Sequence, residues 1–143
     1  MKGTIAKTIT LFDQRGKSMD KASLVTILAE CLAIPTIALQ DYIEWEEIDT
    51  THVKATISYY GISASGIFTF DENGLMLAFK TKDRLATNMD GSTREAEWSA
   101  IISDYQIVNG LRQPKILQSI WHYPEGDNIY FNENKSSVIF EFK

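Results

Sequence analysis

The sequence predicts an α+β fold, in which a curved antiparallel sheet of about eight strands packs on one α-helix. First, only residues 18–39 combine helix-capping residues with apolar positions spaced three and four apart. Second, from residue 42 onward apolar residues tend to recur at every second position, as in strands that bury one face. Third, turn sequences separate these segments at short intervals, which indicates a meander of hairpins.

The helix is expected to begin where Ser18 or Asp20 caps the free N–H groups of the first turn. Pro35 is expected to end it, because proline has no N–H and restricts the residue before it. Between them runs one apolar stripe, which Val25 and Leu32 widen. The members of the stripe are Leu24, Ile27, Leu28 and Cys31.

Segments of alternating hydrophobicity predict the strands. They lie at residues 2–12, 42–48, 52–59, 62–70, 75–82, 93–105, 111–122 and 129–142, the last in two pieces broken at 132–135. Residues 83–92 are expected to form the longest loop. Asn109-Gly110 suits a hairpin turn, since both residue types tolerate positive φ. Pro114 interrupts its strand and suits an edge or a bulge.

A meander of this length must curl to bury one face, which predicts a half-barrel with the helix as its filler. The sequence contains no repeat, no low-complexity tract and no interdomain linker. Residues 1–143 are therefore expected to form a single domain.

The charge balance argues against a general nucleic-acid binder. The chain has 14 basic and 19 acidic residues, a formal charge of −5, and its cations are scattered. The one cysteine, Cys31, cannot form an internal disulfide. No apolar run is long enough to span a membrane, and the N-terminus lacks the apolar core of a signal peptide. We therefore expect no membrane insertion by this chain and a cytoplasmic location.

An ordered set of motifs resembles a bacterial family of domains of unknown function. Members of that family carry a helix of the type LAE…PTAL followed by a V-x-W-E strand. The matching positions are Met19-Asp20, Leu28-Ala29-Glu30, Pro35-Thr36, Ala38-Leu39, Trp45-Glu46, Phe68-x-Phe70-Asp71-x-x-Gly74, Arg84, Trp98, Asp104-Tyr105, Asn109-Gly110, Arg112-x-Pro114 and Trp121. The chain departs from the family pattern at residues 31–34, where an aromatic residue often precedes the proline.

The resemblance implies a fold similar to the half-barrel of LolA-like lipoprotein carriers, in which a curved sheet cups helices. Family members are often longer, with an N-terminal region and sometimes membrane helices. This chain is similar to their C-terminal portion, from about Ser18 to its end. The family brings no established catalytic residue.

Glu30 is the leading candidate for a functional residue, since it lies beside the apolar stripe of the helix. A carboxylate that points inward needs a partner, because burying it unpaired is costly. Arg84, at the start of the long loop, is the expected partner. One interpretation is an ion pair at the mouth of a cavity that binds a polar head group. The other, which is commoner, is a structural salt bridge or a solvated residue.

Four aromatic residues lie on different predicted strands: Trp45, Trp98, Tyr105 and Trp121. They could line a concave apolar pocket for a ligand. Side chains of this size are more often part of the core.

No grouping of residues indicates catalysis, a metal or a cofactor. Residues 61–66 (GISASG) place no serine at the centre of a G-x-S-x-G elbow. His52 and His122 lie far apart in the sequence, and with one cysteine they show no metal-ligand spacing. The acidic run at 41–49 lacks the glycine and the spacing of a calcium loop.

These patterns favour a non-enzymatic module that binds a small apolar or lipid-like ligand in the concave face of the sheet. The alternative is an interaction domain that pairs with an N-terminal region or with a second copy as a homodimer, because an open half-barrel exposes strand edges and apolar surface. An enzyme that uses Glu30 as a general acid or base is a third and weaker hypothesis.

Overall fold

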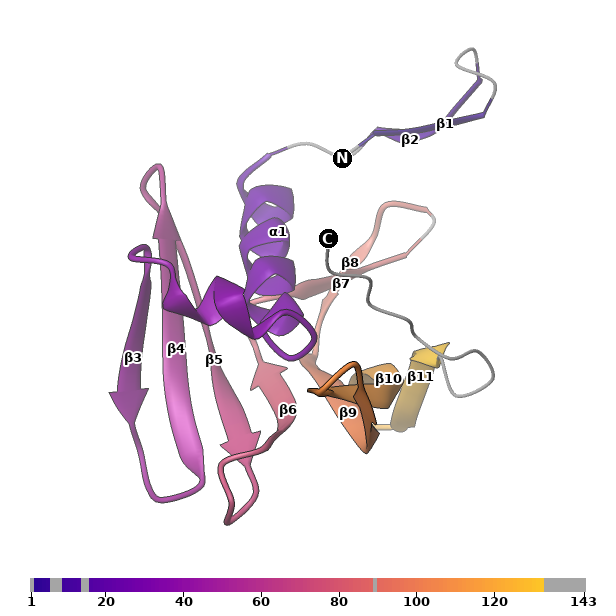
Figure 1. Cartoon of the computed structure of the whole chain (residues 1–143). Helices are drawn as coiled ribbons and strands as arrows, with labels where there is room; N and C mark the ends of the chain where they lie inside the picture. The colour runs from indigo at the N-terminus through magenta and orange to yellow at the C-terminus, as the bar shows by residue number, and fades with distance from the viewer. Residues whose placement is uncertain (1, 6–8, 14–15, 89, 133–143) are drawn as a thin grey trace.

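A seven-stranded antiparallel sheet forms the body of the molecule (Figure 1). The computed structural model describes residues 2–5, 9–13, 16–88 and 90–132. The strands of this sheet are β3 (Ile43–Glu47), β4 (His52–Tyr59), β5 (Ile62–Phe70), β6 (Met76–Thr81), β9 (Glu97–Val108), β10 (Leu111–Tyr123) and β11 (Gly126–Asn132). Their order in space, β11-β10-β9-β6-β5-β4-β3, is their order along the chain. The predicted meander is therefore confirmed.

Two small sheets correct the predicted strand map. Residues 2–12 are not one strand but a hairpin of β1 (Lys2–Ile5) and β2 (Ile9–Asp13), in which each strand satisfies backbone groups of the other. The predicted long loop contains β7 (Leu85–Thr87), which pairs with β8 (Thr93–Glu95). The predicted strand at 93–105 is thus divided at Ala96. Residues 133–142 of the last predicted strand lie outside the described residues.

The helix α1 (Lys17–Glu30) begins and ends earlier than the sequence predicts. Gly16 occupies the N-cap position, and its carbonyl accepts from the N–H groups of Met19 and Asp20. Neither Ser18 nor Asp20 caps the helix, because both lie inside its first turn. The helix ends five residues before Pro35, which instead opens the short 3-10 helix η1 (Pro35–Leu39). Proline suits that first position, where its missing N–H would have no helical partner.

The apolar stripe of α1 packs against β5 and β4, as predicted. Leu24, Val25, Leu28, Cys31 and Leu32 are all buried there. The facing residues of the sheet are Ala55, Ile57, Ala64, Phe68 and Phe79. One helix packed on an antiparallel sheet is the α+β fold that the sequence predicts, and its curvature as a half-barrel stays a prediction.

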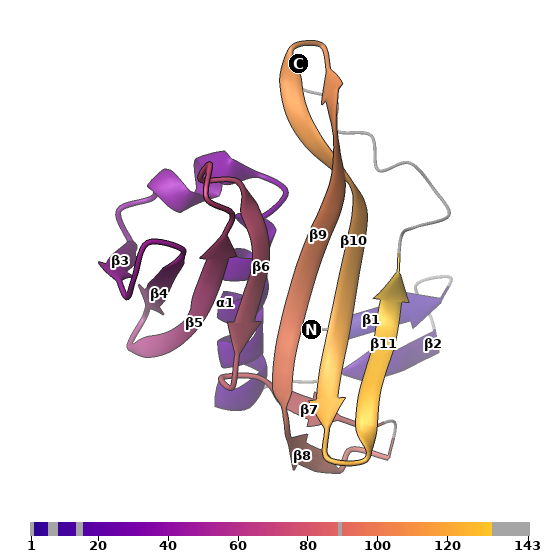
Figure 2. The same cartoon turned by 90° about the horizontal axis from the view of Figure 1, so that it is seen from below.

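The helix covers only part of its face of the sheet. In both views α1 stands over the β4–β6 part, and β9, β10 and β11 extend beyond it (Figures 1 and 2). Trp98 of β9 lies opposite Trp121 of β10, and Ala100 opposite Ser119. These four side chains share one face of the sheet, because facing residues in paired strands point to the same side.

The strand β10 carries two irregularities. Its pairing with β11 shifts between Ser119 and Ile120, so that Tyr130 becomes the extra residue of a bulge. Pro114 pairs with Tyr105 of β9, but β11 ends opposite Gln118. Pro114 therefore lies where no described strand pairs with the outer side of β10, which fits the edge position expected for proline.

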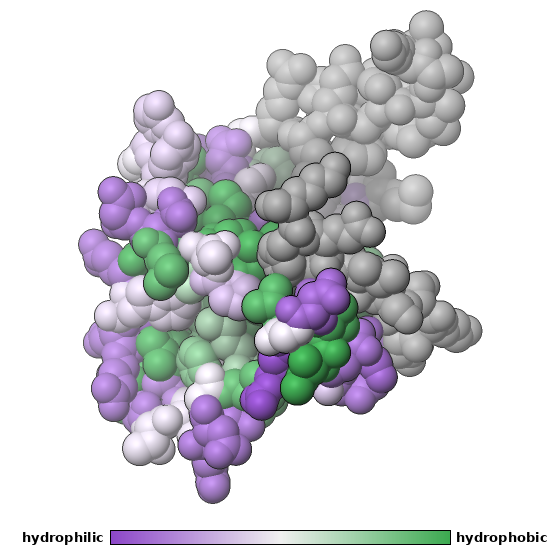
Figure 3. Space-filling view, viewed as in Figure 1, coloured by the Kyte–Doolittle hydropathy of each residue, from purple (hydrophilic) through white to green (hydrophobic). Residues whose placement is uncertain are grey.

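Apolar side chains are exposed at the turn between β9 and β10. This hairpin turns at Asn109-Gly110, both with positive φ, and Figure 3 shows a hydrophobic area over its end. Ile107 and Leu111 are exposed on either side of the turn.

Candidate functional site

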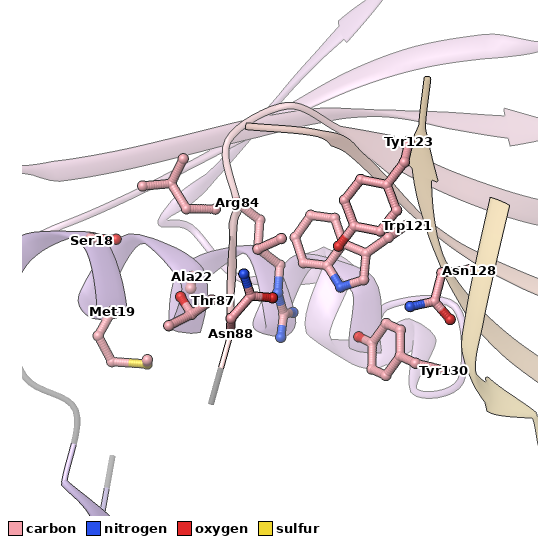
Figure 4. A pocket seen from close by; sticks show the side chains of 12 residues that line it. Ser18, Met19, Ala22, Arg84, Thr87, Asn88, Trp121, Tyr123, Asn128 and Tyr130 are labelled. Carbon is pink, nitrogen blue, oxygen red and sulfur yellow. The ribbon is translucent and has the colours of Figure 1, made fainter. Parts of the chain in front are cut away.

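Two adjoining surface pockets lie along α1, on the sheet face that the helix leaves uncovered. The first has a volume of about 410 Å³ (Figure 4). Its wall comes from the first turns of α1, from β7 and from the paired strands β10 and β11. The described residues that line it are Ser18, Met19, Ala22, Arg84, Leu85, Ala86, Thr87, Asn88, Trp121, Tyr123, Asn128 and Tyr130.

The second pocket has a volume of about 270 Å³ and follows the later turns of α1. Its wall is mostly apolar. The described residues that line it are Thr26, Ala29, Glu30, Ala33, Arg84, Trp98, Ala100, Leu117, Ser119, Tyr130 and Phe131. Arg84 and Tyr130 belong to both pockets, and we call the two pockets together the α1 groove.

Arg84 lies in the segment between β6 and β7, and its side chain lies beside Trp121 in Figure 4. One NH group donates to Thr26 Oγ1 at 3.1 Å, and the Thr26 hydroxyl donates in turn to the Ala22 carbonyl at 3.0 Å. The centre of the guanidinium lies 4.8 Å from the centroid of the Trp98 ring. A cation over an indole face is attracted by the negative face of the ring. These contacts fix the guanidinium where the two pockets meet.

The predicted ion pair between Glu30 and Arg84 is not formed. Both side chains line the apolar pocket, but among the ion pairs of described residues none involves either of them. Glu30 is exposed at the end of α1, because the helix turns its stripe and not this position toward the sheet. An exposed carboxylate needs no ion-pair partner, because it carries no cost of burial.

The predicted aromatic residues divide into two groups. Trp98 and Trp121, which are 3% and 9% exposed, line the α1 groove. Trp45 lies on the edge strand β3, where its Nε1 donates to the Ala38 carbonyl at 3.0 Å and its ring packs on Phe68. Tyr105 lies toward the far end of β9, and its hydroxyl donates to a backbone carbonyl of β6 at 2.6 Å. Trp45 and Tyr105 line neither pocket.

Sequence patterns did not reveal several residues of the groove. Trp98 Nε1 donates to the Tyr130 hydroxyl at 3.0 Å, which joins β9 to β11 across the groove. Tyr130 and Phe131 can both line the apolar pocket because the bulge in the β10–β11 pairing breaks the alternation of faces. Alternation in the sequence alone cannot show such a shift.

A second arginine, Arg94, lies near the groove and already has a carboxylate partner. Arg94 of β8 makes a two-pronged ion pair with Glu125, and its guanidinium stacks 4.2 Å from the centroid of the Tyr123 ring. The hydrogen bonds from Arg94 lower the pKa of Glu125 to about 2. Tyr123 stacks in turn on Trp121. This arrangement holds Tyr123 and Trp121, which both line the larger pocket, in place.

Ser99, His122 and Asp127 form a hydrogen-bonded chain on the opposite face of the sheet. Ser99 Oγ lies 2.8 Å from His122 Nε2, and His122 Nδ1 lies 2.8 Å from Asp127 Oδ1. The order of groups is that of a serine nucleophile, a base and an orienting acid. However, Ser99 is only 2% exposed, and it lies within β9, which pairs on both sides. Backbone N–H groups in such a position are used by the sheet and cannot form an oxyanion hole.

The remaining chemically reactive residues are explained by local structure. Burial raises the pKa of the Cys31 thiol to about 11, so that it behaves as a small hydrophobic residue. His52 contacts Asp49 in the turn before β4, and hydrogen bonds, first from the Thr51 N–H and then from His52, lower the pKa of Asp49 to about 2. Within the described ranges, no three or more His, Cys, Asp or Glu side chains gather as metal ligands would.

These features define an α+β protein in which the described residues form a groove between one helix and an antiparallel sheet. The chain belongs to a family of unknown function, DUF6544, whose profile matches residues 1–133. This confirms the resemblance to a family of domains of unknown function and extends it to the N-terminus. No curated protein and no solved structure matches the chain. None of the described helices has the length and hydrophobicity needed to cross a membrane.

Proposed function

We propose that the chain is a non-enzymatic module that binds a small apolar or amphipathic ligand in the α1 groove. The observation that carries this proposal is the incomplete cover of the sheet by α1, which leaves pockets of about 410 and 270 Å³ beside buried tryptophans. Pockets that bind small molecules are commonly of this size and combine apolar walls with a few polar groups.

A neutral dye tests the groove without reference to charge. We expect Nile red to bind the purified chain saturably, with increased fluorescence. The variant Ala29→Leu places a larger side chain in the apolar pocket and should weaken binding about tenfold, because part of the dye's apolar surface can no longer be buried, at a cost of about 25 cal/mol for each Å². Thr36→Leu adds a leucine on the exposed surface of η1, outside both pockets, and serves as the control. Equal affinity of wild type and Ala29→Leu, or no saturable binding, would contradict the proposal.

Self-association is the second candidate function, and strand β11 favours it. This strand is the outermost of the sheet at one side, and all seven of its residues are exposed. Among the described residues no strand pairs with the outer side of β11, and an edge strand of this kind with apolar side chains is a template for pairing with a second copy. The opposite edge, β3, carries Glu44, Glu46 and Glu47, which discourage such pairing. Light scattering that shows a monomer over a wide concentration range would exclude this second function.

A further inference from the structure

Arg84 is a partly buried cation that has no counter-ion among the residues that the structure describes. Among the described residues no carboxylate pairs with it. In contrast, Arg94, which stacks on the ring of Tyr123, is paired with Glu125. The only hydrogen-bond partner of Arg84 among the described residues is the Thr26 hydroxyl. A guanidinium has five N–H donors, so most of its donors remain available to a ligand. A partly buried guanidinium with free donors can form strong charge-assisted hydrogen bonds with an anionic partner.

The two pockets that meet at Arg84 differ in character. The larger one offers hydrogen-bonding groups from Ser18, Thr87, Asn88 and Asn128, and Arg84 is the one charged residue among its described lining. The smaller one is lined mainly by alanine, leucine and aromatic side chains. Tyr130 stands at the junction. Because its oxygen accepts from Trp98 Nε1, its own proton is free to be donated.

The charges along α1 favour one orientation of a charged ligand in the groove. The larger pocket adjoins the N-terminal turns of the helix, where the helix dipole favours negative charge. Glu30 lines only the smaller pocket, at the C-terminal end of the helix, and disfavours an anion there. The helix advances about 6 Å between Thr26 and Glu30, and the pocket lining continues past the end of the helix to Ala33, which leaves room for an alkyl chain of medium length.

We infer that the ligand of the α1 groove is an amphipathic carboxylate. Its head group binds Arg84 at the junction of the two pockets, and its apolar chain lies past Trp98 in the smaller pocket. A carboxylate matches the planar fork of a guanidinium and can accept two of its N–H groups. This inference rests on the proposed function of the groove, to which it adds the chemical class and the orientation of the ligand.

Three probes that share one alkyl chain test the head group: octanoate, octanol and octylammonium. Binding is measured by calorimetry and by the fluorescence of the tryptophans, using the whole chain. We expect octanoate to bind about tenfold more tightly than octanol, as for a hydrogen bond to a charged group. Octylammonium should bind most weakly. In Arg84→Gln the preference for octanoate should disappear, whereas octanol should bind as before.

Arg112→Gln is the matched control, because it removes an exposed arginine that lines neither pocket. It should keep the preference for octanoate. A salt titration of the wild type gives a second measurement that needs no variant, since added salt should weaken octanoate binding and not octanol binding.

The outcomes separate this inference from the proposed function. Equal binding of octanoate and octanol, an unchanged preference in Arg84→Gln, or no octanoate binding would each overturn the carboxylate assignment. If Nile red still binds and Ala29→Leu still weakens it, the groove remains a ligand site of another class. If the dye fails as well, the proposed function fails with the inference.

Discussion

Gly66 on β5 has no room for even one more carbon atom. A Cβ at this position would lie 2.4 Å from two atoms of the Phe79 ring and 2.7 Å from the Lys80 carbonyl oxygen. Phe79 is fully buried and packs on Phe68, so it cannot move aside. We expect Gly66→Ala to lower the free energy of unfolding by about 1–3 kcal/mol, as overpacked cores do.

Urea unfolding followed by circular dichroism measures this effect. Ser63→Ala lies on the same strand at an exposed position and is the control, with an expected change within about 0.5 kcal/mol. A Gly66→Ala protein as stable as the wild type would show that the ring of Phe79 can be displaced.

Asp83, in the segment between β6 and β7, ties α1 to β5. Its carboxylate accepts from the Ser65 N–H of β5 at 2.8 Å and from Lys21 Nζ of α1 at 2.7 Å. Burial alone would raise the pKa of Asp83, but the hydrogen bonds from Lys21 and Ser65 outweigh it and hold the pKa below its usual value. The folded protein therefore binds this proton less readily than the unfolded chain does.

Asp83→Asn should therefore destabilise the protein in a pH-dependent way. The carboxylate contributes its stability above the unfolded pKa of about 4, and this contribution is lost as the pH falls through the lower folded pKa. Near neutral pH we expect a loss on the order of 1 kcal/mol. Urea titrations at neutral pH and at about pH 3 should show the gap between wild type and variant narrowing in acid. Glu47→Gln, at an exposed carboxylate without an ion pair among described residues, should show no such gap.

The Ser99–His122–Asp127 chain should be structural and not catalytic. Ser99 is buried within a paired strand, so an electrophile cannot reach its oxygen and no oxyanion hole is free. We expect a fluorophosphonate probe to leave the native chain unlabelled under conditions that label a serine protease completely. Labelling of the wild type that disappears in Ser99→Ala would contradict this assignment.

At the scale of residues, the sequence pointed to part of the groove. Glu30, Arg84, Trp98 and Trp121 were predicted as site residues from their types and positions, and all four line it. The predicted partner of Arg84 was wrong, because helix rotation decides where Glu30 points, and the sequence does not specify that rotation closely enough. The Ser99–His122 contact could not be predicted either, since it depends on the register between β9 and β10.

At the scale of elements, the packing of α1 against the sheet can be followed through the reactivity of Cys31. Cys31 follows the last residue of the helix and is fully buried against the sheet, and burial raises its pKa to about 11. At mildly alkaline pH the native thiol should therefore react with Ellman's reagent only through opening of the helix. In urea above the unfolding midpoint the reaction should be fast.

Ser23→Cys in a Cys31→Ala background is the comparison, because Ser23 is exposed on the same helix. Its thiol should react quickly in the native protein. Equal rates at the two positions would mean that the C-terminal end of α1 is not held against the sheet.

The strands were predictable where one face of the strand is buried and the other is exposed to solvent. The strands β4 and β5 were predicted with their observed bounds, because alternation and flanking turns mark both ends. The short strands β7 and β8 were missed or merged, since three residues carry too little pattern. The bulge that places Tyr130 and Phe131 on the groove has no signal in the hydrophobic period.

At the scale of the whole molecule, the meander and its helix follow from local patterns, but the groove does not. Which part of the sheet α1 covers is decided by long-range packing of its stripe on β4 and β5. The face of β9 and β10 beyond α1 is the part of the sheet that the helix does not reach. A pocket of this origin is a property of the assembled layers, and no single segment of the sequence encodes it.

The strands of the large sheet follow the same order in space as along the chain, and this order also determines how the molecule should respond to mechanical force. Each strand of the sheet is followed along the chain by its neighbour in space, so once α1, which precedes β3, has been pulled from the sheet, tension on the two ends acts on the outermost strands, β3 and β11. Antiparallel neighbours joined by a turn open from their free ends, one backbone pair after another. In an optical trap we expect the sheet to peel inward from both edges at low force. The ribbon of β9 and β10, which has the longest run of paired residues, should be the last to separate.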